Sequence, residues 1–186
     1  MKKVKFFPSS WQTFPYTLES NNWDKEGRLI KDLVLKNSYA TKKGVSEMIL
    51  NISKLSVFNK EGKEQFVADF QGQNEVNLKG MHTGRFIRSQ SILKLEPGDY
   101  TTIRFYLNKK GNSFSYTDRT SESVYRFKYL DFEIENEMKL TGDEASQVIL
   151  RFDFEPFDLS SYFRPFLQFF ERSRSLTARF SNSLGL

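Results

Sequence analysis

Acid–base or metal chemistry in this chain would have to use a single histidine and a row of carboxylates. His82 is the only histidine, and there is no cysteine, which excludes a thiol nucleophile and a thiolate-bound metal. A Ser-His-Asp triad would need His82 as its general base, yet it stands in a polar stretch without a nucleophile-elbow sequence. We therefore interpret His82 as a surface residue, and we predict no catalytic residue, no metal site and no cofactor.

Four acidic residues stand at every second position of one predicted strand: Asp131, Glu133, Glu135 and Glu137. Alternate residues of a strand share one face but do not converge on a point, whereas calcium sites usually take their oxygen ligands from a loop. We interpret the row as a solvated strand face. Nothing singles out a carboxylate pair for glycoside hydrolysis, so a carbohydrate-binding or carbohydrate-active domain is the weaker alternative function.

Basic and aromatic residues suggest a second kind of chemistry, the binding of nucleic acid. The net charge is +5, and the ends carry the excess, with nine Lys/Arg against four Asp/Glu in residues 1–43. The residues that would contact phosphates or stack bases on a sheet are Arg104, Arg126 and Arg151 with Tyr106, Tyr125 and Tyr129. No RNP-like or helix-turn-helix signature accompanies them. A nucleic-acid-binding β protein that uses its basic termini is therefore the first alternative.

The scaffold for these side chains is predicted to be mainly β. From Val45 onward, apolar residues alternate with polar ones in runs about ten residues apart, with no helical segment between them. This pattern is typical of an antiparallel β-sandwich. The apolar phase slips by one residue near Ser53 and Lys54, which predicts a β-bulge there. Residues 71–90 are polar and contain several glycines, so we expect a long loop, and the strand-like alternation continues at Tyr125 and Phe127 and then at Leu130, Phe132 and Ile134.

The stretch ILKLEPGDYTTIRFYL, residues 92–107, carries the strongest local signal. Pro97 and Gly98 fit the two corners of a type II turn, which predicts a hairpin around them. Further along, residues of one alternating phase are predicted to be buried: Ile103 and Phe105, and in a later strand Leu150 and Phe152.

Three segments follow from these patterns. Residues 1–27, broken by Pro8 and Pro15, are predicted to be an irregular N-terminal arm, and residues 28–157 a β-sandwich domain. Residues 158–186 are predicted to be a C-terminal tail that contains an amphipathic helix. No segment reaches the roughly 18 apolar residues that cross a bilayer. The candidate partner surface on the tail, for a protein or a second copy of the chain, consists of Phe166, Phe170, Arg172, Arg174 and Arg179.

Three motifs carry a resemblance to a known family: MILNISKLSVFN (48–59), LEPGDYTTIRFYL (95–107) and VILRFDFEP (148–156). Residues 45–155 thereby resemble a bacterial domain family of unknown function that occurs in exported lipoproteins and surface proteins. The resemblance implies an immunoglobulin- or transthyretin-like β-sandwich and carries no catalytic residues. With it, the sequence favours a non-enzymatic domain that binds or scaffolds at a bacterial envelope or surface, although the apolar run at the start stops at Pro8, too early for a signal peptide.

Overall fold

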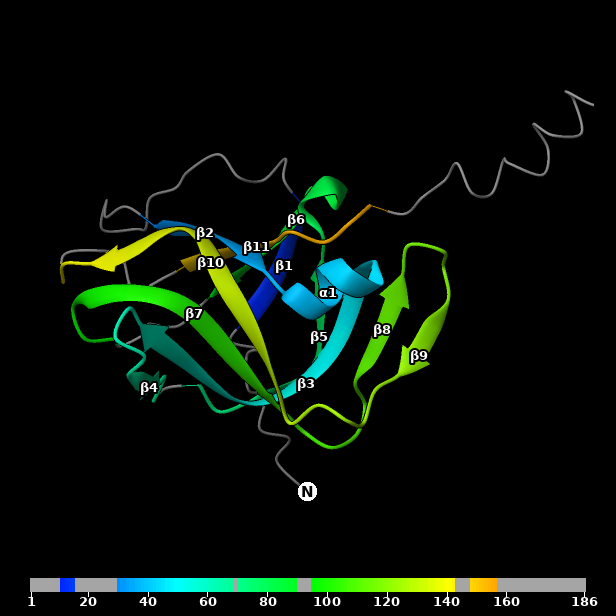
Figure 1. Ribbon diagram of the computed structural model, residues 1–186, viewed down its shortest axis with the longest axis horizontal. Helices are drawn as coiled ribbons and strands as arrows, with labels where there is room; N and C mark the ends of the chain where they lie inside the picture. The colour runs from blue at the N-terminus through cyan, green and yellow to red at the C-terminus, as the bar shows by residue number, and fades with distance from the viewer. Residues whose placement is uncertain (1–10, 16–29, 69, 90–94, 143–147, 157–186) are drawn as a thin grey trace, which may run out of the picture. The chain divides into compact units, whose positions relative to one another are not determined.

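The computed structural model describes residues 11–15, 30–68, 70–89, 95–142 and 148–156, and this part of the chain is mainly β (Figure 1). The helical elements are α1 (Ser38–Lys43) and the 3₁₀ turn η2 (Met81–Thr83). The strands are β1 (Trp11–Pro15), β2 (Lys31–Lys36), β3 (Val45–Asn59), β4 (Glu64–Phe66), β5 (Gln73–Lys79), β6 (Arg85–Ser89), β7 (Gly98–Leu107), β8 (Ser113–Tyr116), β9 (Ser121–Ser123), β10 (Tyr129–Leu140) and β11 (Val148–Phe152). The mainly β class that the alternation predicts is thus confirmed.

The strands form one hydrogen-bonded sheet in the order β1-β6-β11-β2-β10-β7-β3-β8-β9, and β4 and β5 also pair with β3. Figure 1 shows its central strands β3, β7 and β10 as long, twisted neighbours. The pairs are antiparallel with one exception, β11 with β2, which run parallel from Val148 opposite Lys31 to Phe152 opposite Leu35. More than a hundred residues separate β2 from β11, so no short turn obliges them to run in opposite directions.

The long strand β3 contains the predicted bulge. Its pairing with β7 shifts register between Ile52 and Lys54. The shift exchanges the face on which apolar residues fall, as the pleat requires. Residues of both phases are therefore buried, Met48, Leu50 and Ile52 before the bulge and Leu55 and Val57 after it.

The sheet curls around its core. The rings of Phe105 on β7 and Phe152 on β11 lie 6.5 Å apart, although β10 and β2 stand between these strands. On a flat sheet three strand steps would separate them by about 14 Å. An isolated bridge between Gly80 and Phe152 also brings the end of β5 beside β11. Ile103, Phe105, Leu150 and Phe152 are all buried, as predicted.

The predicted hairpin around Pro97 and Gly98 is wrong. Gly98 is already the first residue of β7 and does not adopt the positive φ of a type II turn. Both edges of β7 are occupied, one by β3 and the other by β10. β7 therefore has no free edge for a strand that would precede Pro97, and Leu95 lies outside any strand.

Two further predictions are corrected. Residues 71–90 contain β5, η2 and β6 rather than a long loop; the sequence is polar there because few of its residues, such as Val76 and Leu78, enter the core. The arm of residues 1–27 is not wholly irregular, since β1 pairs with β6 from Trp11 opposite Ser89 to Pro15 opposite Arg85. The predicted tail helix and its partner surface lie outside the described residues.

Candidate functional site

An open groove of about 430 Å³ lies between the start of α1 and the segment that enters β10. Residues 37–39 form one wall, and residues 126–131 form the other. Its volume falls within the range of small-ligand sites, and it contains both aromatic and charged side chains. It is larger than the second cavity described below.

Asn37 fixes the first wall. It is the N-cap of α1, and its Oδ1 accepts a 2.8 Å hydrogen bond from the Ala40 amide, which would otherwise lack a partner. Its Nδ2 donates a 2.8 Å bond to the backbone carbonyl of Asp131 on β10. One buried side chain therefore closes the helix start and ties it to the opposite wall.

The second wall begins as irregular backbone before β10, although the strand-like alternation of the sequence includes Tyr125 and Phe127. The Val124 amide donates to the Asn112 carbonyl at 2.8 Å, and the Leu107 amide donates to the Lys128 carbonyl at 2.9 Å. Between these anchors, the Phe127 ring packs edge-on against Tyr39, with centroids 4.9 Å apart. Phe127 is thus held inward, while its neighbours on both sides stay exposed.

Arg126 lies over the aromatic floor of the groove. Its guanidinium is 5.3 Å from the Tyr39 ring centroid and 5.1 Å from that of Phe127, and it donates to the Tyr39 hydroxyl. Its Nη2 is 3.5 Å from Glu122, yet the side chain remains 59 % exposed. A guanidinium that aromatic faces hold in place can present its remaining N–H groups to a carboxylate or phosphate.

The carboxylate in the groove is already neutralised. Arg104 donates from Nε and Nη2 to the two oxygens of Asp131, at 2.6 and 2.8 Å, and its guanidinium lies 3.9 Å from the centroid of the Tyr129 ring. The hydrogen bond to Asp131 raises the pKa of Arg104 above its already high value, so it remains a cation. Lys128 is exposed and has no ion pair among the described residues. The groove therefore carries a surplus of positive charge.

An aromatic ladder continues from the groove across the outer face of the sheet. Tyr129 lies 6.0 Å from Tyr106, which stacks on Phe66 at 5.7 Å. The Tyr106 hydroxyl donates to Glu64 at 2.7 Å, and the Ser56 hydroxyl donates to the same oxygen at 2.6 Å. Burial alone would raise the pKa of Glu64, but these two bonds and the charge of Arg104 hold it below its ordinary value.

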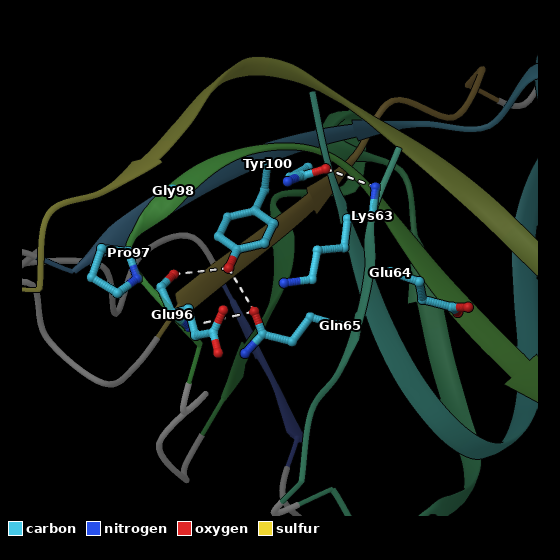
Figure 2. A pocket seen from close by; sticks show the side chains of 8 residues that line it. Lys63, Glu64, Gln65, Glu96, Pro97, Gly98 and Tyr100 are labelled. Atoms are coloured by element: carbon cyan, nitrogen blue, oxygen red, sulfur yellow. Dashed lines mark hydrogen bonds between the residues drawn. The ribbon is translucent and has the colours of Figure 1, made fainter. Parts of the chain in front are cut away.

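A second, smaller cavity of about 120 Å³ lies where Pro97 leads into β7 (Figure 2). In Figure 2, Gln65 and Glu96 lie together beneath the Tyr100 hydroxyl. The hydroxyl is 2.8 Å from the Glu96 carbonyl and 2.7 Å from Gln65 Oε1, so its single proton serves one of two acceptors. Burial, then the charge of Glu96, raises the pKa of Tyr100. This cavity anchors the entry to β7 and has room for only a few water molecules.

The other residues singled out by the sequence are dispersed. His82 is exposed in η2, and no three His, Asp or Glu side chains within the described ranges are close enough to hold a metal ion. The acidic row breaks because the pairing of β10 with β7 shifts register between Glu133 and Met138. Glu135 pairs with Lys36 at 3.3 Å. Arg151 contacts Asp32 with Nε and Nη2, both at 2.9 Å, on the far side of β2 from β10.

The structure brings Arg126 and Tyr129 to one groove, with Tyr125 immediately before them in the chain. Sequence reasoning named these three but not Tyr39 or Lys128, which also line it. The signal that could have found the site is the run YRFKY at residues 125–129, in which aromatic and basic side chains alternate.

No helix among the residues described here is both long enough and apolar enough to cross a membrane. Comparison with known proteins supplies no relative from which a function could be transferred. No protein-family model, no curated protein and no solved structure matches the chain.

Proposed function

We propose that this chain is a non-enzymatic binding domain, and that the groove between residues 37–39 and 126–131 receives an anionic ligand. The carrying observation is the exposed guanidinium of Arg126 above the rings of Tyr39 and Phe127, with a second exposed cation at Lys128. From the resemblance of residues 45–155, we propose that the domain acts at a bacterial envelope or surface, where its binding would serve a scaffolding role.

The chemistry of the groove supports binding rather than proton transfer. Arginine and lysine stay protonated near neutral pH and serve as fixed cations. Asp131, the acidic residue in the lining, has both oxygens occupied by Arg104. Tyr129 contributes an apolar ring with a polar tip, a side chain common at recognition surfaces.

We further infer a sandwich-like arrangement in which the curl of the sheet sets two faces against each other. The core supports this inference because one cluster contains Leu33 of β2, Leu50 of β3, Leu78 of β5 and Leu150 of β11. The tail surface predicted at Phe166 and Phe170 stays a proposal for partner binding.

The experiment is a binding panel measured by bio-layer interferometry at low salt. The probes are a dT15 oligonucleotide, polygalacturonate, poly-glutamate and phosphatidylglycerol vesicles. Arg126→Gln/Lys128→Gln removes both groove cations. The matched control, Lys63→Gln/Lys139→Gln, removes two exposed lysines that lie away from the groove. Lys63 directly precedes β4, and Lys139 is near the end of β10 that is far from Tyr129. We expect at least one probe to bind, and to weaken in the groove variant only. A panel without binding, or equal weakening in both variants, would refute the proposal.

A further inference from the structure

We propose that the ligand of the groove is single-stranded nucleic acid, with Arg126 and Lys128 on phosphates and Tyr125 and Tyr129 stacked against bases. This inference rests on the proposed binding function and names its ligand class. It follows from the order of side chains in YRFKY, from the charge of the groove and from the state of its hydrogen-bonding groups.

Single-stranded nucleic acid repeats a flat base and a charged phosphate. A protein segment in which aromatic and basic residues alternate can contact both. Phe127 points inward against Tyr39, so it anchors the segment rather than offering a ring to a ligand. The two flanking tyrosines are exposed, Tyr125 by 68 % and Tyr129 by 43 %. Among the residues that the structure describes, Tyr125 has no ring contact, so it is available for stacking.

Charge complementarity favours a polyanion over a neutral ligand. Arg126 and Lys128 are two positions apart and both exposed. The ion pair of Arg104 with Asp131 cancels the negative charge of the groove lining, and although Arg126 lies 3.5 Å from Glu122, Lys128 has no ion pair among the described residues. Cations beside exposed rings form the pattern by which sheet proteins bind single strands, because an unpaired base leaves its face free to stack.

The hydrogen-bonding groups of the groove disfavour a saccharide. Sugar hydroxyls need carboxylates or amides with unused donors and acceptors. Both polar atoms of Asn37 are engaged, one with the Ala40 amide and one with the Asp131 carbonyl. Each oxygen of Asp131 accepts one bond from Arg104, which holds the carboxylate in place and leaves it fewer acceptor sites for a hydroxyl. The groups best suited to a sugar are therefore already engaged, whereas Lys128 has no ion pair and Tyr125 no ring contact among the described residues, and Arg126 and Tyr129 stay exposed beside their partners.

The aromatic ladder supplies a path for further nucleotides. From Tyr129 it passes Tyr106 and reaches Phe66, which is 51 % exposed on β4. At that end Lys54 is exposed, with its Nζ 5.9 Å from the Phe66 ring centroid. A cation thus stands at each end of the ladder, and the Glu64 carboxylate between them is engaged by the Tyr106 and Ser56 hydroxyls, so a strand several nucleotides long meets rings along it and charge at its ends.

Fluorescence anisotropy with labelled dT15 tests the proposal on the full chain. The same oligonucleotide as a duplex and labelled polygalacturonate are the comparison probes. Tyr125→Ala is the main variant, because a side chain 68 % exposed without a ring partner is removed without disturbing the fold. Arg126→Gln/Lys128→Gln is the second, with Lys63→Gln/Lys139→Gln as its charge-matched control, and circular dichroism verifies that each variant is folded.

We expect dT15 to bind more tightly than the duplex and polygalacturonate. Tyr125→Ala should weaken dT15 binding by at least about fivefold, the lower end of the loss expected for one stacked base. The groove double variant should flatten the slope of log K against log salt by about 1.4, as for two phosphate contacts on a single strand. The lysine control should leave the slope nearer to that of the wild type.

Three results would overturn the proposal, and they separate it from the broader function. If polygalacturonate binds and dT15 does not, the ligand class is wrong while an anion-binding groove stands. If dT15 binds equally to wild type and Tyr125→Ala, and the two double variants lose the same slope, the contact is general charge attraction elsewhere. If none of these probes binds, the ligand class fails, and the proposed function fails with it if poly-glutamate and phosphatidylglycerol vesicles do not bind either.

Discussion

Truncation of Phe152 tests the curled core most directly. The side chain is fully buried on β11, and its ring lies 5.4 Å from Phe132 and 6.5 Å from Phe105. Phe152→Ala removes that ring from between strands that are not neighbours in the sheet, so the cavity has little chance to collapse. Losses of this kind cost about 3–5 kcal/mol. With a urea m-value of about 2 kcal/mol/M, the unfolding midpoint should fall by about 2 M.

Phe66→Ala is the matched control, because Phe66 is the same residue type on the outer face and 51 % exposed. Its stacking on Tyr106 is worth less than about 1 kcal/mol at such exposure, so its midpoint should move by no more than about 0.5 M. Both variants should be followed by circular dichroism and tryptophan fluorescence, with coincident transitions. Similar midpoints for Phe152→Ala and Phe66→Ala would show that the sheet does not enclose β11 as described.

Three other perturbations test separate parts of the fold. Gly80→Ala should lower stability by about 1–3 kcal/mol, because its new Cβ would lie 2.9 Å from the Phe154 carbonyl oxygen; an unchanged thermal midpoint would contradict this close approach. Arg104→Gln should lower the stability of the fold by about 1–2 kcal/mol, because it breaks both hydrogen bonds to the half-exposed Asp131. A double-mutant cycle with Asp131→Asn tests this, and additive losses in the cycle would refute the coupling. Because the pKa of Glu64 lies below its ordinary value, its stabilising effect is present above the unfolded pKa of about 4.3 and is lost as the pH falls through the folded pKa. Wild type should therefore lose more stability than Glu64→Gln on acidification below about pH 4.3, and parallel urea-midpoint curves against pH would count against the hydrogen-bonded carboxylate.

The parts of the fold that sequence predicts well are those set by side chains on one strand. Phe105 and Phe152 fall on the apolar phase of period two, and both are buried. The bulge after Ile52 was visible for the same reason, since a slip in that period has to be absorbed by the backbone if both halves of β3 are to face the core. Such predictions need no knowledge of which strand lies alongside.

Strand pairing could not be predicted in this way, because it depends on residues far apart in the chain. Pro97 and Gly98 have the local chemistry of a turn, but β3 and β10 compete for the edges of β7 and occupy both. The strands β5 and β6 escaped prediction for a related reason. Their alternation is short and mostly polar, and their positions are set by long partners, such as β3 for β5, rather than by their own composition.

In the candidate site, too, the sequence shows the residue types but not the contacts between residues far apart in the chain. The run YRFKY supplies the cations and rings, and its composition alone suggests a ligand with charge and flat surfaces. What the sequence does not supply is the opposite wall, which Asn37 holds against the Asp131 carbonyl across 94 positions of the chain. It also does not reveal that Arg104 neutralises Asp131, a pairing fixed by the register of β7 with β10. The residue types thus suggest an anionic ligand, and the proposal of a nucleic-acid strand over a sugar rests on the tertiary pairing of Arg104 with Asp131, which leaves Lys128 without an ion pair among the described residues and Arg126 exposed beside Glu122.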